Sequence, residues 1–479
     1  MRSNYEMKLS KNNMMPIDGF KEYGTNSNLL VIGSSGSGKT MNLVLPMLLD
    51  DFKDEPVTFV VQDCKGLLYK NLSKKFIDEG YDVKVLDFVN PRQSNIFNPF
   101  DYIFSFDDAR KIVDSLASSS VASLSDHFWE TSAKDLICNL IMYMKHEYSP
   151  DLFNISFLSE LVGLFSKDYS IVNNVKDRNW LVEMKINRDN KVTEKYTDKN
   201  KVPTVFYKRL QRMNERRKID YFVNLETYYQ YPSGTFSSII AEAKALLSPY
   251  VGEDISKIIT GPDQMNLHDL GNTKTIIFVN PSDVYRIYDP IVGLFYSTCL
   301  QCVINGADKS KDGRLRYPFR LLLDDFASGT KINDFDKAIS NIRSRNVSCT
   351  LIIQSISQLT TLYGQTGAQT IISNCSSQIY LGSNDLDQEL DISRRLNTSY
   401  EKIHELDRKK LIIISENKRP IIDYKFDYKE HPNFKLCGIY DLKNQKNFRE
   451  VQIYAKEEKL RAHSAKEDKQ NDNVKTDNV

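Results

Sequence analysis

The chain has 479 residues, of which 41% are hydrophobic and 27% are charged, so it can bury a large core and form two or three domains. Its 64 Lys and Arg residues nearly balance 63 Asp and Glu residues, so net charge predicts no polyanionic partner and any basic surface must be local. Seven cysteines, an odd number mostly within apolar runs, argue against a disulfide framework and predict a reducing, cytoplasmic location.

Neither a signal peptide nor a membrane-spanning segment is expected. The N-terminal segment MRSNYEMKLSKNN lacks the apolar stretch of a signal peptide. No stretch approaches the roughly 18 to 20 continuous apolar residues that a bilayer requires. We therefore expect that this chain does not cross a membrane by itself.

The first elements in chain order alternate between strands and helices. Residues 29–33 (LLVIG) form a short apolar run, and residues 39–49 then place apolar side chains at helical spacing. A strand over 57–62, a helix over 67–79 and a strand over 83–86 follow. This βαβαβ pattern predicts a parallel sheet.

The β pattern fades between residues 107 and 256, where the periodicity is helical, and returns afterwards. Later strands are expected at 275–279, 320–323, 350–353 and 378–381, with a hairpin over 411–426. The predicted class is α/β, with a mainly parallel sheet and an inserted all-α domain. The predicted divisions are an N-terminal extension (1–27), the α/β domain (28–106 and 257–455), the all-α domain (107–256) and a disordered charged tail (456–479).

A phosphate-binding loop lies between the first strand and the first helix. The pattern G-x-x-x-x-G-K-[ST] is complete in GSSGSGKT. Small residues let backbone N–H groups converge on phosphate oxygens at the positive end of the helix dipole. Lys39 is expected to neutralise the β- and γ-phosphates of ATP, and the Thr40 hydroxyl to bind Mg²⁺. The predicted nucleotide-binding residues are Gly33, Ser34, Ser35, Gly36, Ser37, Gly38, Lys39 and Thr40.

A strand much later in the sequence supplies the acidic residues that such a site needs. The run FRLLLDD (319–325) is an apolar strand that ends in two carboxylates. Asp324 fits the position that holds Mg²⁺ through its water shell, and Asp325 the position that orients or polarises the attacking water. The alternative is that both aspartates only cap a following helix. Cys299 and Cys302 have the spacing of a redox or zinc pair, but no second pair accompanies them, so no further metal is assigned.

Several segments together resemble the VirD4/TraG family of conjugative coupling proteins, from about Asn28 to Phe434. DCKGLLY (63–69) resembles the family's D-P-K-G-E-L motif, and SNIFNP (94–99) its S-x-x-x-N-P segment. Phe128 and Trp129 match its F-W-x-x-x-A helix. Further matches are Pro46, the stretch from Asp324 through Arg343 to Gln354, IIQSISQL (352–359), Tyr363, Gly364, Asn374 and Gly382.

The resemblance implies a RecA-like P-loop NTPase domain with an all-α domain, assembled as a homohexameric ring. It implies an ATPase that uses ATP and Mg²⁺ to deliver relaxase-bound single-stranded DNA to the channel subunits of type IV secretion. By the same resemblance, Arg343 matches the arginine finger that reaches a neighbouring subunit's γ-phosphate, and Gln354 matches a residue that senses the γ-phosphate or the water. The alternatives are a surface salt bridge for Arg343 and a capping or turn role for Gln354.

The chain departs from the family pattern in three places. Asp325 stands where the family usually has Glu, and its shorter side chain predicts slower or water-bridged hydrolysis. Leu67 replaces the Glu of the D-P-K-G-E-L motif. The P-loop begins some thirty residues into the sequence, which leaves no room for the family's N-terminal membrane helices. This suggests either a Gram-positive-like form that reaches the cytoplasmic face of the membrane through partners, or a missing N-terminal anchor.

Two other functions remain open from the sequence. The shorter Asp325 side chain and the missing anchor also fit a weakly or non-hydrolysing ATP-binding recruitment module of the same machinery. A small-molecule kinase could use the same loop, although a large helical insertion is hard to explain on that view.

A basic stretch marks a candidate DNA contact. Residues 176–218 contain 14 Lys or Arg against 6 Asp or Glu, interleaved with Trp180, Tyr196, Phe206 and Tyr207. Such a stretch could follow a phosphate backbone. A solvated loop beside an amphipathic helix is the alternative.

Overall fold

The computed structural model describes residues 6–18, 24–117, 127–164, 233–282, 286–327 and 331–461. The chain divides into two compact units, one formed by residues 1–95 with 264–479 and the other by residues 96–263. The first unit is α/β, and the described helices and loops of the second unit contain no strand.

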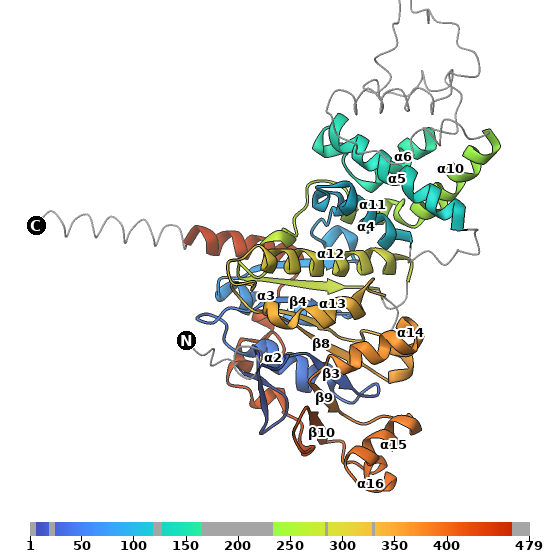
Figure 1. The fold of residues 1–479 in the computed structure, drawn as a ribbon. Helices are drawn as coiled ribbons and strands as arrows, with labels where there is room; N and C mark the ends of the chain where they lie inside the picture. The colour runs from blue at the N-terminus through green and yellow to red at the C-terminus, as the bar shows by residue number, and fades with distance from the viewer. Residues whose placement is uncertain are drawn as a thin grey trace, which may run out of the picture. The chain divides into compact units, whose positions relative to one another are not determined.

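A large sheet organises the first unit (Figure 1). Within the described residues it has nine strands in the order β11-β10-β9-β3-β8-β7-β4-β6-β5. The seven strands from β9 to the β5 edge are parallel to one another. At the other edge, β10 runs antiparallel to β9, and β11 runs antiparallel to β10. The strand bounds are β3 (Leu29–Ile32), β4 (Thr58–Gln62), β5 (Asp82–Asp87), β6 (Thr275–Asn280), β7 (Phe319–Leu323), β8 (Val347–Ile353), β9 (Ser377–Tyr380), β10 (Lys410–Ser415) and β11 (Ile421–Tyr424).

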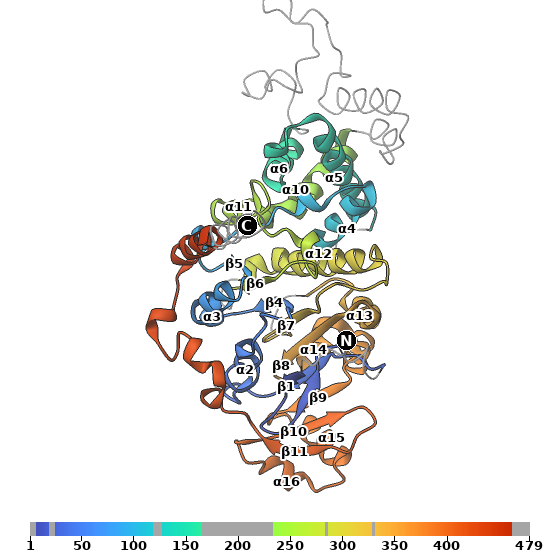
Figure 2. The same ribbon diagram turned by 90° about the vertical axis from the view of Figure 1, so that its left-hand side faces the viewer.

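Helices cover both faces of this sheet, which is why its central strands are buried along their whole length rather than on alternate residues. Every residue of β3, β4, β7 and β8 is buried. Figure 2 shows α2 and α3 on one side of the sheet and α12, α13 and α14 on the other. The helix bounds are α2 (Leu45–Leu49), α3 (Leu67–Asp78), α12 (Asp289–Asp308), α13 (Phe335–Asn341), α14 (Ile356–Ser373), α15 (Leu386–Arg395) and α16 (Tyr400–His404).

Helix α12 is unusually apolar. Together with the preceding turn it spans Arg286–Asp308 and is the one described helix whose length and composition would allow it to cross a bilayer. However, 61% of its apolar window is buried inside the protein. Cys299 and Cys302 are among the buried residues of this helix, as free thiols.

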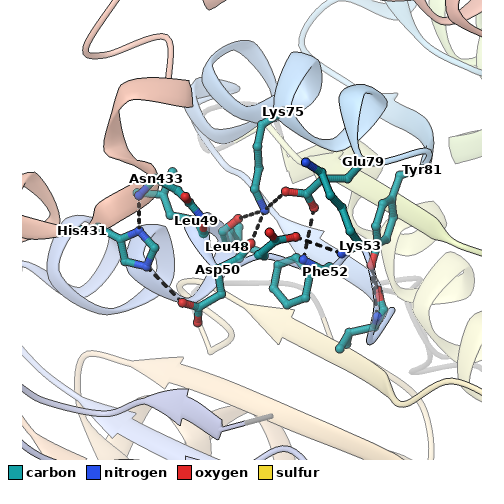
Figure 3. Close-up of polar contacts among 12 residues, drawn as sticks. Leu48, Leu49, Asp50, Phe52, Lys53, Lys75, Glu79, Tyr81, His431 and Asn433 are labelled. Carbon is teal, nitrogen blue, oxygen red and sulfur yellow. Dashed lines mark hydrogen bonds and ion pairs between the residues drawn. The ribbon is translucent and has the colours of Figure 1, made fainter. Parts of the chain in front are cut away.

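The helix that follows the P-loop is anchored at its far end by a buried lysine. Its first part (Thr40–Val44) is wound as a π-helix, and α2 continues it. Figure 3 shows Lys75 of α3 reaching the end of α2, where its ammonium donates to the carbonyls of Leu48 (3.0 Å) and Asp50 and pairs with Glu79 (3.1 Å). These bonds satisfy carbonyls that the helix end leaves open.

The C-terminal segment also contacts this helix end. Asn433 donates to the carbonyl of Leu49 (2.9 Å), and a ring nitrogen of His431 lies 3.0 Å from the carboxylate of Asp50 (Figure 3). Further along, residues 448–461 are helical, with Val451 fully buried. The sequence predicted disorder from residue 456 onward, but residues 456–461 continue this helix, which packs on the α/β unit. Residues 462–479 lie outside the described residues.

Residues 6–18, near the N-terminus, are bonded to the sheet of the first unit. Strands β1 (Glu6–Lys8) and β2 (Met14–Pro16) form an antiparallel hairpin. Its turn is tied to β11, because Ser10 and Asn13 both donate to the carboxylate of Asp423 (2.5 and 2.8 Å). Burial raises the pKa of Asp423, but hydrogen bonds from Ser10, Asn12 and the backbone of Tyr424 outweigh it and lower the pKa to about 2.

The second unit is helical in its described part. Its longer helices are α4 (Phe106–Ala117), α5 (His127–Glu147), α6 (Ile155–Leu164), α10 (Ser233–Leu247) and α11 (Glu253–Ile259). Phe128 and Trp129 lie in the first turn of α5, with their rings edge to face at 5.0 Å. The basic stretch 176–218 lies outside the described residues, so the structure does not test the DNA contact predicted there.

Candidate nucleotide-binding site

The predicted site residues meet at the carboxyl edge of the parallel sheet. The P-loop follows β3, Gln354 follows β8, and Asp324 and Asp325 follow β7, three strands that are neighbours in the sheet. A pocket of about 360 Å³ is lined by the loop, both aspartates and Gln354. Ligands of open α/β sheets bind at this edge, so the position fits a nucleotide.

The loop has the backbone shape that its glycines allow. Gly36 and Gly38 have φ of 77° and 88°, which L side chains rarely adopt. A Cβ at Gly33 would lie 2.5 Å from the Ser37 hydroxyl oxygen. The loop is also held from outside, because the N–H of Ser34 donates to the carbonyl of Gly382 (2.9 Å).

Lys39 is folded against its own loop. Its ammonium donates to the carbonyls of Gly33 (2.8 Å) and Ser34 (3.2 Å) and lies 3.9 Å from a carboxylate oxygen of Asp325. The residue is only 8% exposed. A cation held in this loop by neutral carbonyls can turn to phosphate oxygens without a large movement.

Thr40 and Asp324 are joined directly. The Thr40 hydroxyl donates to Oδ2 of Asp324, and the side chain of Gln62 donates to the Asp324 carbonyl (2.5 Å). The other carboxylate oxygen, Oδ1, is buried and has no hydrogen-bond partner among the described residues. Burial raises the pKa of this carboxyl, and the bond from Thr40 opposes that shift. A buried acceptor beside a hydroxyl is a donor set that suits a hydrated Mg²⁺.

Asp325 and Gln354 face each other at the open side of the pocket. The Gln354 amide donates to Asp325 Oδ1 (3.3 Å), and the Asp325 side chain is 37% exposed. Asp325 has φ of 54°, a left-handed conformation that aspartate tolerates better than most residues. The alternative that Asp324, Asp325 or Gln354 caps a helix receives no support. The N-cap residue of α13 is Asp334, and that of α14 is Ser355.

Arg343 is not part of this pocket. It is exposed and lies in the turn Arg343–Arg345, just before β8 begins. The P-loop lies at the opposite, carboxyl end of β3, which is parallel to β8. The seven residues of β8 separate these two edges by roughly 20 Å, farther than an arginine side chain extends.

Sequence reasoning missed several residues at the site. Asp63, Cys64 and Lys65 also line the pocket, although they entered the sequence argument only as part of a family motif. Lys425, just after β11, donates to the carbonyls of Ser37 (2.9 Å) and Leu381 (3.3 Å) and so braces the P-loop. Burial lowers the pKa of this lysine. The hairpin was predicted, but no sequence signal placed its end beside the loop.

Comparison with known proteins identifies the family. The type IV secretory system conjugative DNA transfer family matches residues 6–399, most of the chain. The chain belongs to this conjugative DNA transfer family. The resemblance to VirD4/TraG coupling proteins is thereby confirmed.

Curated relatives agree over a shorter region. VirD4 of Agrobacterium fabrum is 26% identical over 181 residues, which are 36% of this chain and 26% of VirD4. VirD4 of Rhizobium radiobacter is 27% identical over 149 residues, 30% of this chain and 21% of that protein. The matched regions thus span about a quarter of the length of these relatives.

Solved structures confirm the predicted RecA-like α/β fold. The coupling protein TrwB in complex with the non-hydrolysable ATP analogue ADPNP aligns with a TM-score of 0.60 at 16% identity, over 89% of this chain and 90% of TrwB. TrwB with ADP and Mg²⁺ aligns with a TM-score of 0.58 at 15% identity, again over 89% and 90%. At this identity the likeness shows the fold alone.

Proposed function

We propose that this chain is an ATPase of conjugative DNA transfer, which binds ATP with Mg²⁺ and uses its hydrolysis to move relaxase-bound single-stranded DNA toward a type IV secretion channel. The observation that carries the proposal is the direct bond between Thr40 and Asp324 in a chain of this family. On this proposal the protein works at the cytoplasmic face of the membrane. TrwB, which binds nucleotide in the same fold, supports the choice of ligand.

The side chains of the pocket divide the work on this proposal. Lys39 leaves the loop carbonyls and binds the β- and γ-phosphates, and the hydroxyl of Ser37, buried without a partner in the described structure, donates to a phosphate oxygen. Thr40 and the free oxygen of Asp324 hold Mg²⁺ and its water, which neutralises phosphate charge. Asp325 orients or deprotonates the attacking water, and Gln354 holds Asp325 in position.

Arg343 acts on this proposal in a neighbouring subunit. It lies at the edge of the sheet opposite to its own P-loop, so an arginine finger at this position can serve only another copy of the chain. A ring of six copies would place each Arg343 beside the next subunit's nucleotide. An arginine finger is worth about 10³ to 10⁵ in rate in other P-loop enzymes, so hydrolysis would require assembly.

A second candidate is an ATP-binding recruitment module that hydrolyses weakly or not at all. The observation in its favour is Asp325, whose carboxylate is one methylene shorter than the Glu expected there and is already hydrogen-bonded to Gln354. This candidate would keep ATP binding and lose the response of turnover to DNA.

The test is ATP turnover by the full chain, with its oligomeric state verified, with and without single-stranded DNA. We expect DNA to stimulate turnover, and Lys39→Ala and Arg343→Ala each to lower it by about 10³. Mixing the two variants should restore part of the rate, because an Arg343→Ala subunit keeps its own loop and receives Arg343 from a Lys39→Ala neighbour. Lys337→Ala, which removes an exposed cation on nearby α13, is the control. A near-zero rate in a verified hexamer, unchanged by DNA, would contradict the ATPase and favour the recruitment module.

A further inference from the structure

A second pocket lies beside the nucleotide pocket at the same edge of the sheet. Its volume is about 500 Å³, within the range of small-molecule sites. It lies at the carboxyl ends of β4, β6 and β5, whereas the nucleotide pocket lies at those of β3, β8 and β7. The segment Asp63–Lys65 lines both pockets, and the other residues of the second pocket have no part in the proposed ATPase.

Two buried polar side chains of this second pocket lack hydrogen-bond partners. Tyr69 is 7% and Asn280 6% exposed. The Tyr69 hydroxyl and the Oδ1 atom of Asn280 have no partner among the residues that the structure describes. A buried polar atom without a partner costs about 1 to 3 kcal/mol, so two in one cavity indicate that something else bonds to them. One can donate or accept, and the other can only accept.

The charges at the opening of the pocket favour an anion. Lys65, Lys70 and Lys446 all line it. Neither Lys65 nor Lys70 forms an ion pair within the described part of the chain, and both are exposed. The Lys446 ammonium donates to the carbonyl of Lys443 (3.0 Å), a neutral partner that leaves its charge in place. A group of ammonium ions without carboxylate partners around a concave surface raises the local concentration of phosphate or carboxylate ligands.

The two acidic residues of the pocket are already occupied by backbone donors. Asp63 accepts from the N–H groups of Leu67 (3.0 Å) and Tyr69 (2.8 Å). Asp87 accepts from the N–H groups of Val89 and Asn90 (both 2.9 Å), and from the amide of Asn280. These carboxylates therefore do not neutralise the lysines by direct pairing.

The outer wall of the pocket is held in place from a distant part of the sequence. Lys446, Asn447 and Phe448 form this wall. The N–H of Lys446 donates to the carbonyl of Lys70 (3.1 Å), and the Gln445 side chain donates to Asn71 (3.1 Å). The wall is thus bonded to α3, which also supplies Tyr69 and Lys70, so the two sides of the cavity keep their spacing.

We propose that this second pocket binds a small phosphorylated molecule of nucleotide size, distinct from the ATP of the P-loop. Its phosphate meets Lys65, Lys70 and Lys446 at the opening. A hydroxyl or amino group at its other end donates to Asn280 and bonds to Tyr69, and a planar ring packs against Phe448. The inference goes beyond the proposed ATPase and does not depend on it.

The test is binding of AMP to the full chain carrying Lys39→Ala, measured by calorimetry, with inorganic phosphate as a second probe. The Lys39→Ala background weakens the P-loop site, so that the second pocket is observed separately. We expect one saturable site for AMP. Lys70→Glu should weaken it at least about tenfold, because it reverses a charge at the opening, and Tyr69→Phe about three- to tenfold, because it removes one hydrogen bond.

Lys74→Glu is the matched control, since Lys74 is one turn further along α3 and pairs with Asp78 outside the pocket. It should leave AMP binding unchanged. Absence of saturable AMP binding, or binding that Lys70→Glu and Tyr69→Phe both leave unchanged, would overturn the proposal. Phosphate that binds as tightly as AMP would overturn the nucleotide-sized ligand. Circular dichroism of each variant separates these results from a failure to fold.

Discussion

Thr40 and Asp324 lie 284 positions apart in the sequence and are hydrogen-bonded to each other through Oδ2 of the carboxylate. The bond joins the start of the P-loop helix to the end of β7 and leaves Oδ1 of Asp324 buried without a partner in the described structure. On the proposed function, the free energy of leaving this oxygen unbonded would be recovered when hydrated Mg²⁺ binds there. The proposal therefore has these two residues arranged for Mg²⁺ before the nucleotide binds.

Asp324→Asn is expected to remove this Mg²⁺ site while keeping the shape of the side chain. ATP turnover should fall by about two orders of magnitude or more, because the metal stabilises developing phosphate charge. Nucleotide affinity measured with EDTA should be nearly unchanged, whereas the gain in affinity on adding Mg²⁺ should disappear. An undiminished Mg²⁺ response in the variant would contradict the assignment of Asp324.

Asp325→Asn separates hydrolysis from binding. Asparagine tolerates the left-handed backbone at this position but cannot accept a proton, so kcat should fall about 10²- to 10⁴-fold. ATP affinity should stay within about twofold, because Asp325 lies at the open side of the pocket. Asp325→Glu restores the longer side chain of the family and should raise kcat above wild type. Equal kcat in wild type and Asp325→Asn would show that the residue has no part in water activation.

Asp63 predicts a pH dependence of stability. Burial raises the pKa of this carboxyl to about 6, from an ordinary value of 3.8. The folded state therefore binds the proton more tightly than the unfolded state. The stabilisation from this group is fully present below about pH 3.8 and is lost as pH rises through 6.

The measurement is the free energy of unfolding in urea, for wild type and Asp63→Asn, between pH 4 and 7. As pH rises from 4 to 7, the free energy of unfolding of wild type should fall relative to that of Asp63→Asn, by at most about 3 kcal/mol. A difference that does not change with pH would contradict the raised pKa.

Replacing Lys75, which lies outside the candidate nucleotide-binding pocket, should cause a large loss of stability. The side chain is 1% exposed and pairs with Glu79, so Lys75→Met leaves a buried carboxylate without its partner and should cost about 3 kcal/mol. Lys74→Met breaks a more exposed ion pair on the same helix and should cost less than about 1 kcal/mol. Chemical denaturation of both variants gives the comparison, and equal losses would contradict the anchoring role of Lys75.

The parts of the fold that depend on local sequence could be predicted. The strand, loop and helix around Gly33 to Thr40, and the buried strand that ends just before Asp324, are set by composition within a few residues of each feature. Parallel pairing then brings their carboxyl ends to one edge. This is why the residues of the candidate nucleotide-binding pocket could be grouped from the sequence alone.

The order of the strands could not be predicted in the same way. Strand β6 lies between β4 and β5, although it follows them by nearly two hundred residues in the chain. Nothing local in the sequence specifies this insertion. Asn280 and Phe278 consequently reach the second pocket only through the topology, and no motif indicated that pocket.

The C-terminal segment shows the limit of composition as a guide. Residues 456–461 are highly charged, which favours disorder when a segment is considered alone. They nevertheless continue a helix whose earlier residues pack on the α/β unit: Val451 is fully buried, and the Tyr454 hydroxyl donates to Asp78 (2.6 Å). Tertiary contacts of a few neighbouring residues decide the structure here.

The most direct test of the central claim is DNA transfer between cells. In the organism that encodes this chain, its gene is replaced by the Lys39→Ala form, and conjugative transfer of DNA to a recipient is counted, with the protein level verified. We predict that transfer falls by several orders of magnitude and returns when the wild-type gene is supplied. Transfer at the wild-type frequency with Lys39→Ala as the only copy would contradict the claim that ATP bound at this P-loop drives conjugative transfer.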